Sequence, residues 1–228
     1  LCGVDDPAVG EQARAAQLEK AGVSLESMNV LFPGDIRLTG PRADFSAVDS
    51  YLEENLPKAQ ALGVKVVVFG SGGARRVPEG FPQEEAFAQL VELCHRAGKR
   101  FTLHRAFDMC RDPFAALELC KELGVDTVLT SGQKNTCLEG LPLLEELWPR
   151  RGGVELLLGA GISAAAIRRI RESLPQARAF HMSGKITVES PMSYRKGDVS
   201  MGLPGFDEYT LWRTDPENLR AARKELME

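Results

Sequence analysis

An imidazole, a guanidinium and a carboxylate lie close together in the middle of the chain, at His104, Arg105 and Asp108. Imidazole exchanges protons near neutral pH, and guanidinium binds carboxylates and phosphates through its fork of N–H donors. The set could hold an anionic ligand and exchange a proton with it, so His104 and Asp108 are candidate catalytic residues and Arg105 a candidate ligand-binding residue. The alternative is structural: Arg105 and Asp108 pair to fix a loop, and His104 points inward with a hydrogen-bond partner.

A second histidine, His181, is followed by Ser183 and Lys185. Alternate side chains on a strand share a face, so His181 and Ser183 should point the same way. We take His181 as a third candidate catalytic residue and Ser183 and Lys185 as candidate ligand-binding residues. The alternative is a buried, neutral histidine whose hydrogen bonds are satisfied within the protein.

Two glycine-containing turns are candidate binding sites for an anion. Ser131 and Gly132 form the first, and the second runs from Ser71 to Arg76, with Arg75 as a cation. Backbone N–H groups in such turns often bind phosphate, and the arginines also suit a carboxylate or a sugar hydroxyl. The alternatives are an ordinary strand-to-helix turn for the first and an exposed loop with solvated arginines for the second.

These residues follow short apolar runs that alternate with helical periodicity. The predicted strands are 28–32, 64–69, 100–104, 126–130, 154–158 and 178–182, with 1–4 as an optional seventh. The predicted helices are 7–21, 44–62, 83–97, 113–123, 138–148, 163–173 and 215–227. The alternation favours an α/β fold with a parallel sheet, and the polar residues after the strands favour a TIM-type βα barrel. Six or seven strands are too few for the usual eight, so the barrel is either incomplete or contains strands that the pattern does not show.

Composition indicates one globular domain over residues 1–228. The chain has 43% hydrophobic residues and a formal charge of −4, from 28 basic and 32 acidic residues. This balance argues against nucleic-acid and membrane partners. The chain shows no basic region followed by an apolar stretch at its start, and its apolar runs are short, so we expect a cytoplasmic protein. Five widely spaced cysteines suggest reduced thiols and no structural zinc site.

From about residue 98 to 228 the chain resembles the CutC family, barrel proteins named for copper homeostasis. The resemblance rests on these segments: FTLHRAFDM at 101–109, VLTSGQ at 128–133, LEGL at 138–141, GAGI at 159–162, HMSGK at 181–185 and SPMSYR at 190–195. It implies a CutC-like copper homeostasis protein whose strand-end pocket binds a small anionic or polyol ligand, with Arg195 as a further ligand-binding residue.

Residues 1–97 lack the family's early Glu-x-Cys strand and its Arg-Pro-Arg-Gly-Gly-Asp-Phe loop. They look instead like the front half of xylose-isomerase-like sugar isomerases and epimerases, through NVLFPGDIRLTG at 29–40 and VVFGSGGARRVPEGF at 67–81. We therefore expect a join between two barrel families near Arg96–Arg100. A sugar isomerase or epimerase and a folded chimera without activity remain alternatives.

Metal binding is expected to be weak or absent, and no metal ligand is assigned. Copper needs soft ligands at close range, and its only local candidates are Met109 and Cys110 with His104 nearby. Copper as a cofactor is therefore implied by the resemblance alone. The isomerases' metal-binding carboxylates belong to strands that this chain replaces.

The strand count also leads us to expect self-association. An open parallel sheet leaves edge strands with unpaired N–H and C=O groups, which favour a homodimer. The segment 202–228, with Phe206, Tyr209, Leu211 and Trp212 as a compact apolar set, is expected to cover part of the opening.

Overall fold

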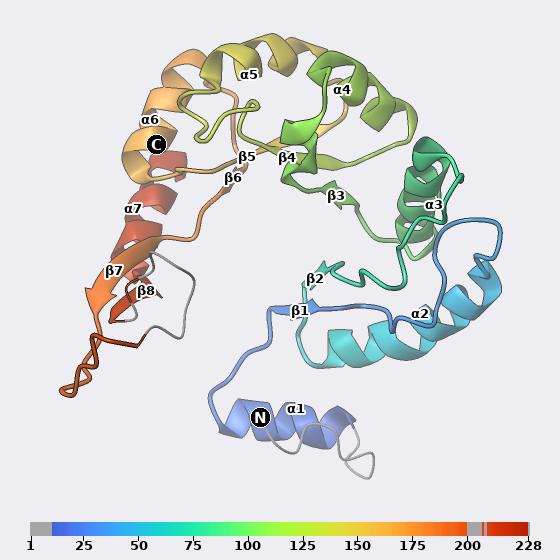
Figure 1. The fold of residues 1–228 in the computed structure, drawn as a ribbon, viewed down its shortest axis with the longest axis horizontal. Helices are drawn as coiled ribbons and strands as arrows, with labels where there is room; N and C mark the ends of the chain where they lie inside the picture. The colour runs from blue at the N-terminus through green and yellow to red at the C-terminus, as the bar shows by residue number, and fades with distance from the viewer. Residues whose placement is uncertain (1–10, 200–206, 208, 228) are drawn as a thin grey trace. The chain divides into compact units, whose positions relative to one another are not determined.

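The computed structural model describes residues 11–199, 207 and 209–227 (Figure 1). The chain divides into two compact units, Leu1–Arg100 and Phe101–Glu228. In both units, parallel strands alternate with helices along the chain.

The described part of the first unit, from residue 11 onward, contains three helices and a two-stranded parallel sheet. Its elements are α1 (Glu11–Lys20), β1 (Ser27–Asn29), α2 (Phe45–Ala61), β2 (Val66–Val68) and α3 (Gln83–Arg96). The strands β1 and β2 pair in parallel, with Ser27 opposite Val66. The helix α2 begins after Asp44 because the Asp44 carboxylate accepts hydrogen bonds from the N–H groups of Ser46 and Ala47.

The core of the first unit lies between the loops that follow β1 and β2 and the helices α2 and α3. Its buried members are Phe32, Leu38, Val48, Leu52, Ala74 and Leu93. The Phe32 ring lies 5.4 Å from the Tyr51 ring and 5.6 Å from the Phe69 ring, centroid to centroid. These contacts fix both loops, because Phe32 belongs to the first and Phe69 to the second.

The second unit contains a four-stranded parallel sheet in the order β3-β4-β5-β6. The strands are β3 (Thr102–Leu103), β4 (Thr127–Thr130), β5 (Glu155–Gly159) and β6 (Phe180–His181). The connections contain the 3₁₀ helices η1 (Arg105–Met109) and η2 (Trp148–Arg150) and the helices α4 (Pro113–Glu122), α5 (Leu141–Leu147) and α6 (Ala164–Ser173). Consecutive parallel strands place all four carboxyl ends at one edge, here called the carboxyl edge.

One face of this sheet is packed against helices, and the other is partly exposed, with Thr127 buried on it. Val128, Leu156 and Leu158 are buried on the face along which α4, α5 and α6 lie (Figure 1). On the other face Glu155 and His181 are exposed, and Leu129 is half-buried. The alternation along β4 and β5 therefore buries every second side chain beneath the helices.

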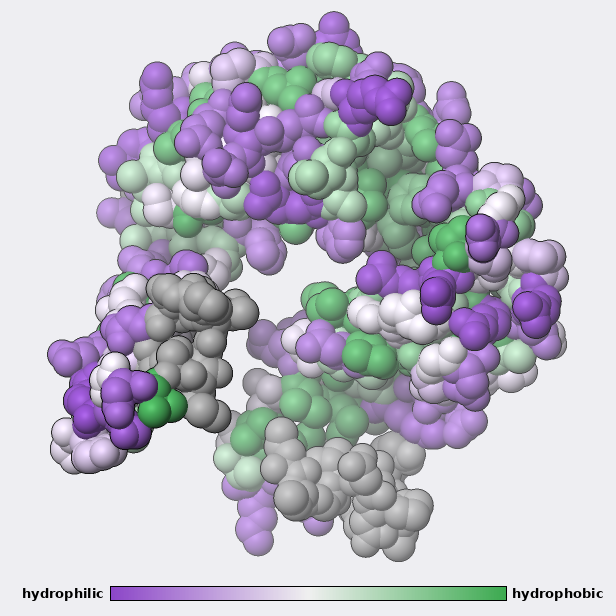
Figure 2. Space-filling model, viewed as in Figure 1, coloured by the Kyte–Doolittle hydropathy of each residue, from purple (hydrophilic) through white to green (hydrophobic). Residues whose placement is uncertain are grey.

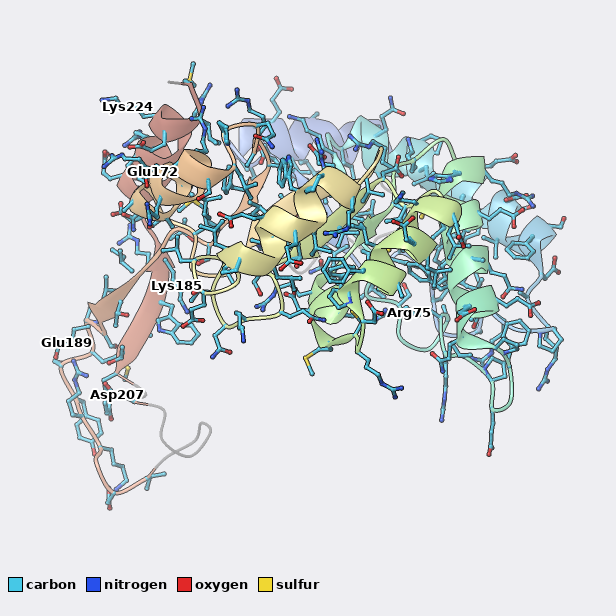
Figure 3. The ribbon with its side chains drawn as sticks, turned by 90° about the horizontal axis from the view of Figure 1, so that it is seen from above. Arg75, Glu172, Lys185, Glu189, Asp207 and Lys224 are labelled. Atoms are coloured by element: carbon cyan, nitrogen blue, oxygen red, sulfur yellow. The ribbon has the colours of Figure 1, made fainter. Side chains whose placement is uncertain are left out.

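The chain continues beyond the sheet as a β-hairpin and a last helix. The strands β7 (Lys185–Glu189) and β8 (Thr210–Thr214) pair in antiparallel fashion, and α7 (Pro216–Met227) packs on α6. The Arg168 guanidinium forms an ion pair with the Glu225 carboxylate, at 2.5 Å. Figure 3 shows Lys185, Glu189 and Asp207 along the hairpin, with Glu172 on α6 and Lys224 on α7.

The α/β fold class predicted from the sequence is confirmed. All six predicted strands are present as β1 to β6, although every one except β5 is shorter than its apolar run, and the optional strand at 1–4 lies outside the described residues. The described residues form six parallel strands and not the eight of a closed barrel, so the TIM-type series is incomplete. The hairpin β7–β8 was not predicted.

The expectation of a compact apolar cover near the C-terminus is wrong for the residues that the structure describes. Trp212 is 60% exposed and Leu211 44% exposed, and Tyr209 lies against the Arg195 guanidinium; Phe206 lies outside the described residues. Because β8 alternates its side chains between two faces, Leu211 and Trp212 cannot belong to one apolar cluster.

Hydrophobic side chains are also exposed in the first unit. Figure 2 shows them over β1 and β2, where Val30, Val66 and Val68 are each at least 50% exposed. Among the described residues, no helix has the length and apolar character needed to cross a membrane.

Candidate functional site

The Asp108 carboxylate is the centre of the densest polar network at the carboxyl edge. Asp108 lies in η1, after β3, and its side chain is only 5% exposed. Its donors are the Thr130 hydroxyl (2.6 Å), the Ser131 N–H (3.0 Å) and hydroxyl (2.9 Å), the Gln133 N–H (3.2 Å) and Arg105 Nε (2.7 Å). We call these five residues the Asp108 clamp. The clamp ties the loop after β3 to the end of β4.

The hydrogen bonds keep the Asp108 carboxylate ionised. Burial raises the pKa of Asp108, but hydrogen bonds from Thr130, Arg105, Ser131 and the Gln133 N–H outweigh it and hold the pKa below its usual value. An ionised carboxylate with this many internal donors is poorly placed to accept a proton from a ligand. The geometry therefore matches the structural alternative for Asp108, in which it pairs with Arg105 and fixes the loop.

The clamp depends on an unusual turn after β4. Gly132 and Gln133 both have positive φ, 70° and 58°, which directs the N–H groups of Ser131 and Gln133 toward Asp108. The turn also crosses Gly140 so closely that a Cβ on Gly140 would lie 1.9 Å from the Ser131 carbonyl oxygen. The donor turn that the sequence suggests for a phosphate thus binds the protein's own carboxylate.

Arg105 extends from the clamp toward solvent. Its Nη2 donates to the Ser131 hydroxyl at 2.7 Å and to the Lys134 carbonyl at 3.1 Å, and its side chain is 42% exposed. Asp108 and Ser131 therefore hold the guanidinium in one orientation while part of it stays open to a ligand. Thr130, Gln133 and Lys134 also take part in this network, and sequence reasoning missed them. The sequence signal that could have indicated a tight loop here was the presence of Gly132 and Gly140.

The two candidate histidines lie at the same edge of the sheet. His104 precedes η1, and its Nδ1 accepts a hydrogen bond from the Ala106 N–H at 3.1 Å, which leaves Nε2 to carry the proton of the neutral ring. His181 ends β6 opposite Gly159 of β5. Both side chains are exposed, and β3 and β6 are three strand spacings apart, about 14 Å along the sheet.

Gly159 lies between Leu129 and His181 on the exposed face of the sheet. A Cβ at this position would be 2.7 Å from Leu129 Cδ1 and 3.6 Å from His181 Cβ. The first distance is a clash, so a side chain here would displace the end of Leu129, whereas the second is ordinary van der Waals contact. Gly159 thus leaves room for Leu129 beside His181.

The remaining candidates are dispersed among other elements. Ser183 is exposed beyond β6, whereas Lys185 lies in the hairpin with its Nζ 3.8 Å from the centroid of the Trp212 ring. Arg195 binds the Glu189 carboxylate at 3.1 Å and the Ser190 carbonyl at 2.8 Å. The structure thus brings Arg105, Asp108, Ser131 and Gly132 together, with the Gly132 N–H bonded to Thr130 Oγ1.

The two candidates in the first unit have different surroundings. The Ser71 hydroxyl is buried and accepts a hydrogen bond from the Phe32 N–H at 2.8 Å, so it fixes one loop to the other. Arg75 has a buried Nε without a hydrogen-bond partner in the described part of the chain. Arg75 Nε could therefore still donate a hydrogen bond, whereas the Ser71 hydroxyl already accepts one from the Phe32 N–H.

The described residues do not fit a copper centre. They contain no cluster of three or more His, Cys, Asp or Glu residues that could hold a metal ion. Burial raises the pKa of Cys120 to about 11 and that of Cys137 to about 12, and the Cys137 thiol already bonds the Gly159 carbonyl. Copper binds the thiolate form of cysteine, which burial disfavours at both positions.

Comparison with known proteins supports a family relationship. The model of the CutC family matches residues 42–186. The copper homeostasis protein cutC homolog of Mus musculus is 36% identical over 171 residues, covering 74% of this chain and 60% of the relative. The homolog of Homo sapiens is 34% identical over 197 residues, covering 84% of this chain and 70% of the relative. The chain thus spans less than two thirds of the mouse protein's length.

A solved structure is also similar over most of the chain. The CutC protein of Streptococcus agalactiae aligns with a TM-score of 0.43 and 20% identity, covering 77% of this chain and 84% of that protein.

The expected join between two barrel families is not borne out. The family match begins at residue 42 and continues to residue 186, so it crosses the expected seam at Arg96–Arg100 without interruption. Residues 42–97, which belong to the part predicted to come from another family, lie within this match. The isomerase and inactive-chimera alternatives thereby lose the argument that rested on a foreign first part.

Proposed function

Because the chain belongs to the CutC family, we propose that it acts in copper homeostasis as a cytoplasmic protein that binds a small anionic or polyol ligand. Copper homeostasis is the role in the names of its mouse and human relatives. We place the ligand at the carboxyl edge of the second unit. The observation that carries the proposal is the Asp108 clamp. In it the Asp108 carboxylate binds Arg105 and fixes its orientation, while part of the Arg105 guanidinium stays exposed.

The side chains around the clamp define the ligand's chemistry. Arg105 supplies a fixed cation for a carboxylate or phosphate, and His104 supplies Nε2 as a donor. His181 and Ser183, from the end of β6, suit hydroxyl groups. In this proposal Asp108 is a positioning residue, and copper is handled without a resident copper centre.

Titration calorimetry with gluconate, which combines a carboxylate with a polyol, tests the proposal on the full chain. We expect saturable binding that weakens about tenfold in Arg105→Gln and in His181→Gln, because each loses a charge-assisted or polar contact. His95→Gln, on α3 of the first unit, is the matched control and should bind as the parent does. Equal binding by all four proteins would place the ligand elsewhere.

A parallel titration with Cu(I) against a colorimetric chelator separates the two ways of handling copper. We expect no stoichiometric site that competes with the chelator, since the described cysteines and histidines do not cluster. A one-to-one copper site lost in Cys110→Ser or His104→Gln would show that the protein holds the metal itself.

A further inference from the structure

A hollow of about 580 Å³ lies in the first unit, at the loops that follow β1 and β2. Its charged lining consists of Arg37 and Arg42 from the first loop and Arg76 and Glu79 from the second. We call it the arginine hollow. Such a volume is typical of a site for a small molecule, and loops after the carboxyl ends of parallel strands are the usual place for ligands in α/β proteins.

The frame beneath the hollow is rigid. The Leu38 N–H bonds the Ala74 carbonyl at 3.0 Å, and the buried Thr39 hydroxyl donates to the Arg76 carbonyl at 3.1 Å. At Gly40, where φ is +86°, a Cβ would lie 2.6 Å from Pro78 Cγ, so the two loops touch through backbone and proline ring. The arginines therefore project from loops whose order is fixed before any ligand arrives.

The charge of the hollow is not neutralised by the protein. Within the described residues Arg37, Arg42 and Arg76 form no ion pair, and Arg37 Nη1 donates a hydrogen bond to the Gly73 carbonyl at 2.9 Å. Against these three cations stands a single carboxylate, Glu79, leaving a local formal charge of 3 − 1 = +2. Unpaired guanidinium groups on a rigid frame attract a compact anion.

We propose that the arginine hollow binds a small phosphate monoester. A phosphate dianion matches the local charge and accepts bidentate hydrogen bonds from more than one guanidinium. Pro41, Val77 and Pro78 provide apolar surface for the carbon skeleton of the ligand. The Glu79 carboxylate repels a second anionic group and accepts hydrogen bonds from hydroxyls, so it selects an ester whose remaining part is neutral and hydroxylated.

Sequence analysis named Arg75 as the cation of the Ser71–Arg76 turn. Its neighbour in the chain, Arg76, is the residue that lines the hollow. Arg75 is labelled in Figure 3, and its buried, unpartnered Nε belongs to the same loop as Arg76. Arg37 and Arg42 come from the other loop, which sequence reasoning did not connect with the Ser71–Arg76 turn. The pairing of the two loops through Thr39 and Arg76 makes these arginines part of one site.

The test is calorimetric titration of the full chain with glycerol 3-phosphate, inorganic phosphate and glycerol. We expect saturable binding of glycerol 3-phosphate, weaker binding of phosphate and none of glycerol. Arg42→Gln and Arg76→Gln should each weaken binding of glycerol 3-phosphate about tenfold or more, while Glu79→Gln, which removes the repelling charge, should strengthen binding of inorganic phosphate. All three residues are exposed, so these substitutions should leave the fold intact, which circular dichroism checks.

The control is Arg223→Gln, which removes an equal charge from the exposed face of α7. Binding weakened equally by this variant would show a general charge effect and overturn the proposal. Binding of random RNA oligomers or anionic vesicles without saturable binding of glycerol 3-phosphate would also overturn it. Binding of glycerol 3-phosphate that is lost in His181→Gln but kept in Arg42→Gln and Arg76→Gln would place the phosphate at the carboxyl edge and overturn this proposal, so its failure is distinguishable from failure of the proposed gluconate site.

Discussion

At the scale of single residues, the Asp108 clamp makes one carboxylate important for stability. Replacing Asp108 with Asn removes the charge that pairs with Arg105 and directs an NH2 group at existing donors. We expect Asp108→Asn to lower the free energy of unfolding by about 3 kcal/mol at neutral pH, measured by urea denaturation. Asp35→Asn, at an exposed carboxylate of the first unit, is the control and should change stability by less than about 0.5 kcal/mol.

The parent protein and Asp108→Asn should also differ in how their stability changes with acid. The folded-state pKa of Asp108 is depressed below its ordinary value of 3.8, so its stabilisation is complete well above that pH and is lost as the pH falls through the folded pKa. The stability gap between the parent and Asp108→Asn should therefore narrow below about pH 4. A gap that is constant from neutral to acid pH would show that the carboxylate's charge is not the source of the stabilisation.

Two thiols are expected to be inert in the folded protein. Burial raises the pKa of Cys120 to about 11 and of Cys137 to about 12, so almost none of either is thiolate at about pH 8. Iodoacetamide followed by mass spectrometry should leave both unmodified in the native chain and modify both fully in denaturant. Rapid native alkylation of Cys137 would contradict its burial and its bond to the Gly159 carbonyl.

At the residue scale, the structural alternative for Arg105 and Asp108 agrees with the structure, because these two residues are neighbours in the chain. Arg105 and Asp108 are three residues apart, and their pairing follows from that spacing and from opposite charge. The Ser131 and Gln133 N–H groups could be foreseen only as donors, because their direction depends on positive φ at Gly132 and Gln133. Identification of their acceptor required the position of η1 beside β4, which is a tertiary fact.

At the scale of elements, the loop between β4 and α5 is closed by two glycines. A Cβ on Gly140 would meet the Ser131 carbonyl at 1.9 Å, and neither partner is a movable side chain. We expect Gly140→Ala to destabilise the protein by about 3 kcal/mol or more, measured by chemical denaturation. Gly153→Ala is the matched control: a Cβ there meets nothing within 4 Å, so its effect should be near zero. Equal stability of the two variants would contradict the close approach of Gly140 to the Ser131 carbonyl.

The same crossing explains an error in a predicted boundary. Apolar periodicity suggested a helix from residue 138, yet α5 begins at Leu141, because the chain through Gly140 must first pass the turn at Gly132. The helices α2, α3, α4 and α6 were located within one residue at each end, since Asp44, Asp112 and Ser163 cap three of them and Pro82 precedes the other. The hairpin β7–β8 was missed because its exposed strands lack a continuous apolar run.

At the scale of the whole molecule, the sequence predicted the alternation of strands and helices, and the structure shows how that series is grouped. Parallel strands form sheets of two and four in separate units. The number of strands can be predicted from local apolar runs. Closure of the sheet depends on which strands pair with each other, and a single apolar run does not indicate its partner. The single domain expected over residues 1–228 therefore remains a prediction.

Edge strands lead to the last prediction, a homodimer. Within the second unit β3 and β6 are the edges of the sheet, and the two-stranded hairpin β7–β8 leaves Trp212 exposed on one face and Leu211 on the other. Isolated two-stranded hairpins are marginally stable in water, and free edges favour pairing with another chain.

We expect sedimentation velocity to show a monomer–dimer equilibrium that shifts toward the dimer as concentration rises. Trp212→Lys should shift it toward the monomer if the hairpin contributes, whereas Arg223→Lys, on α7, should not. A single monomeric species at every concentration would mean that the edges and the hairpin are satisfied within one chain.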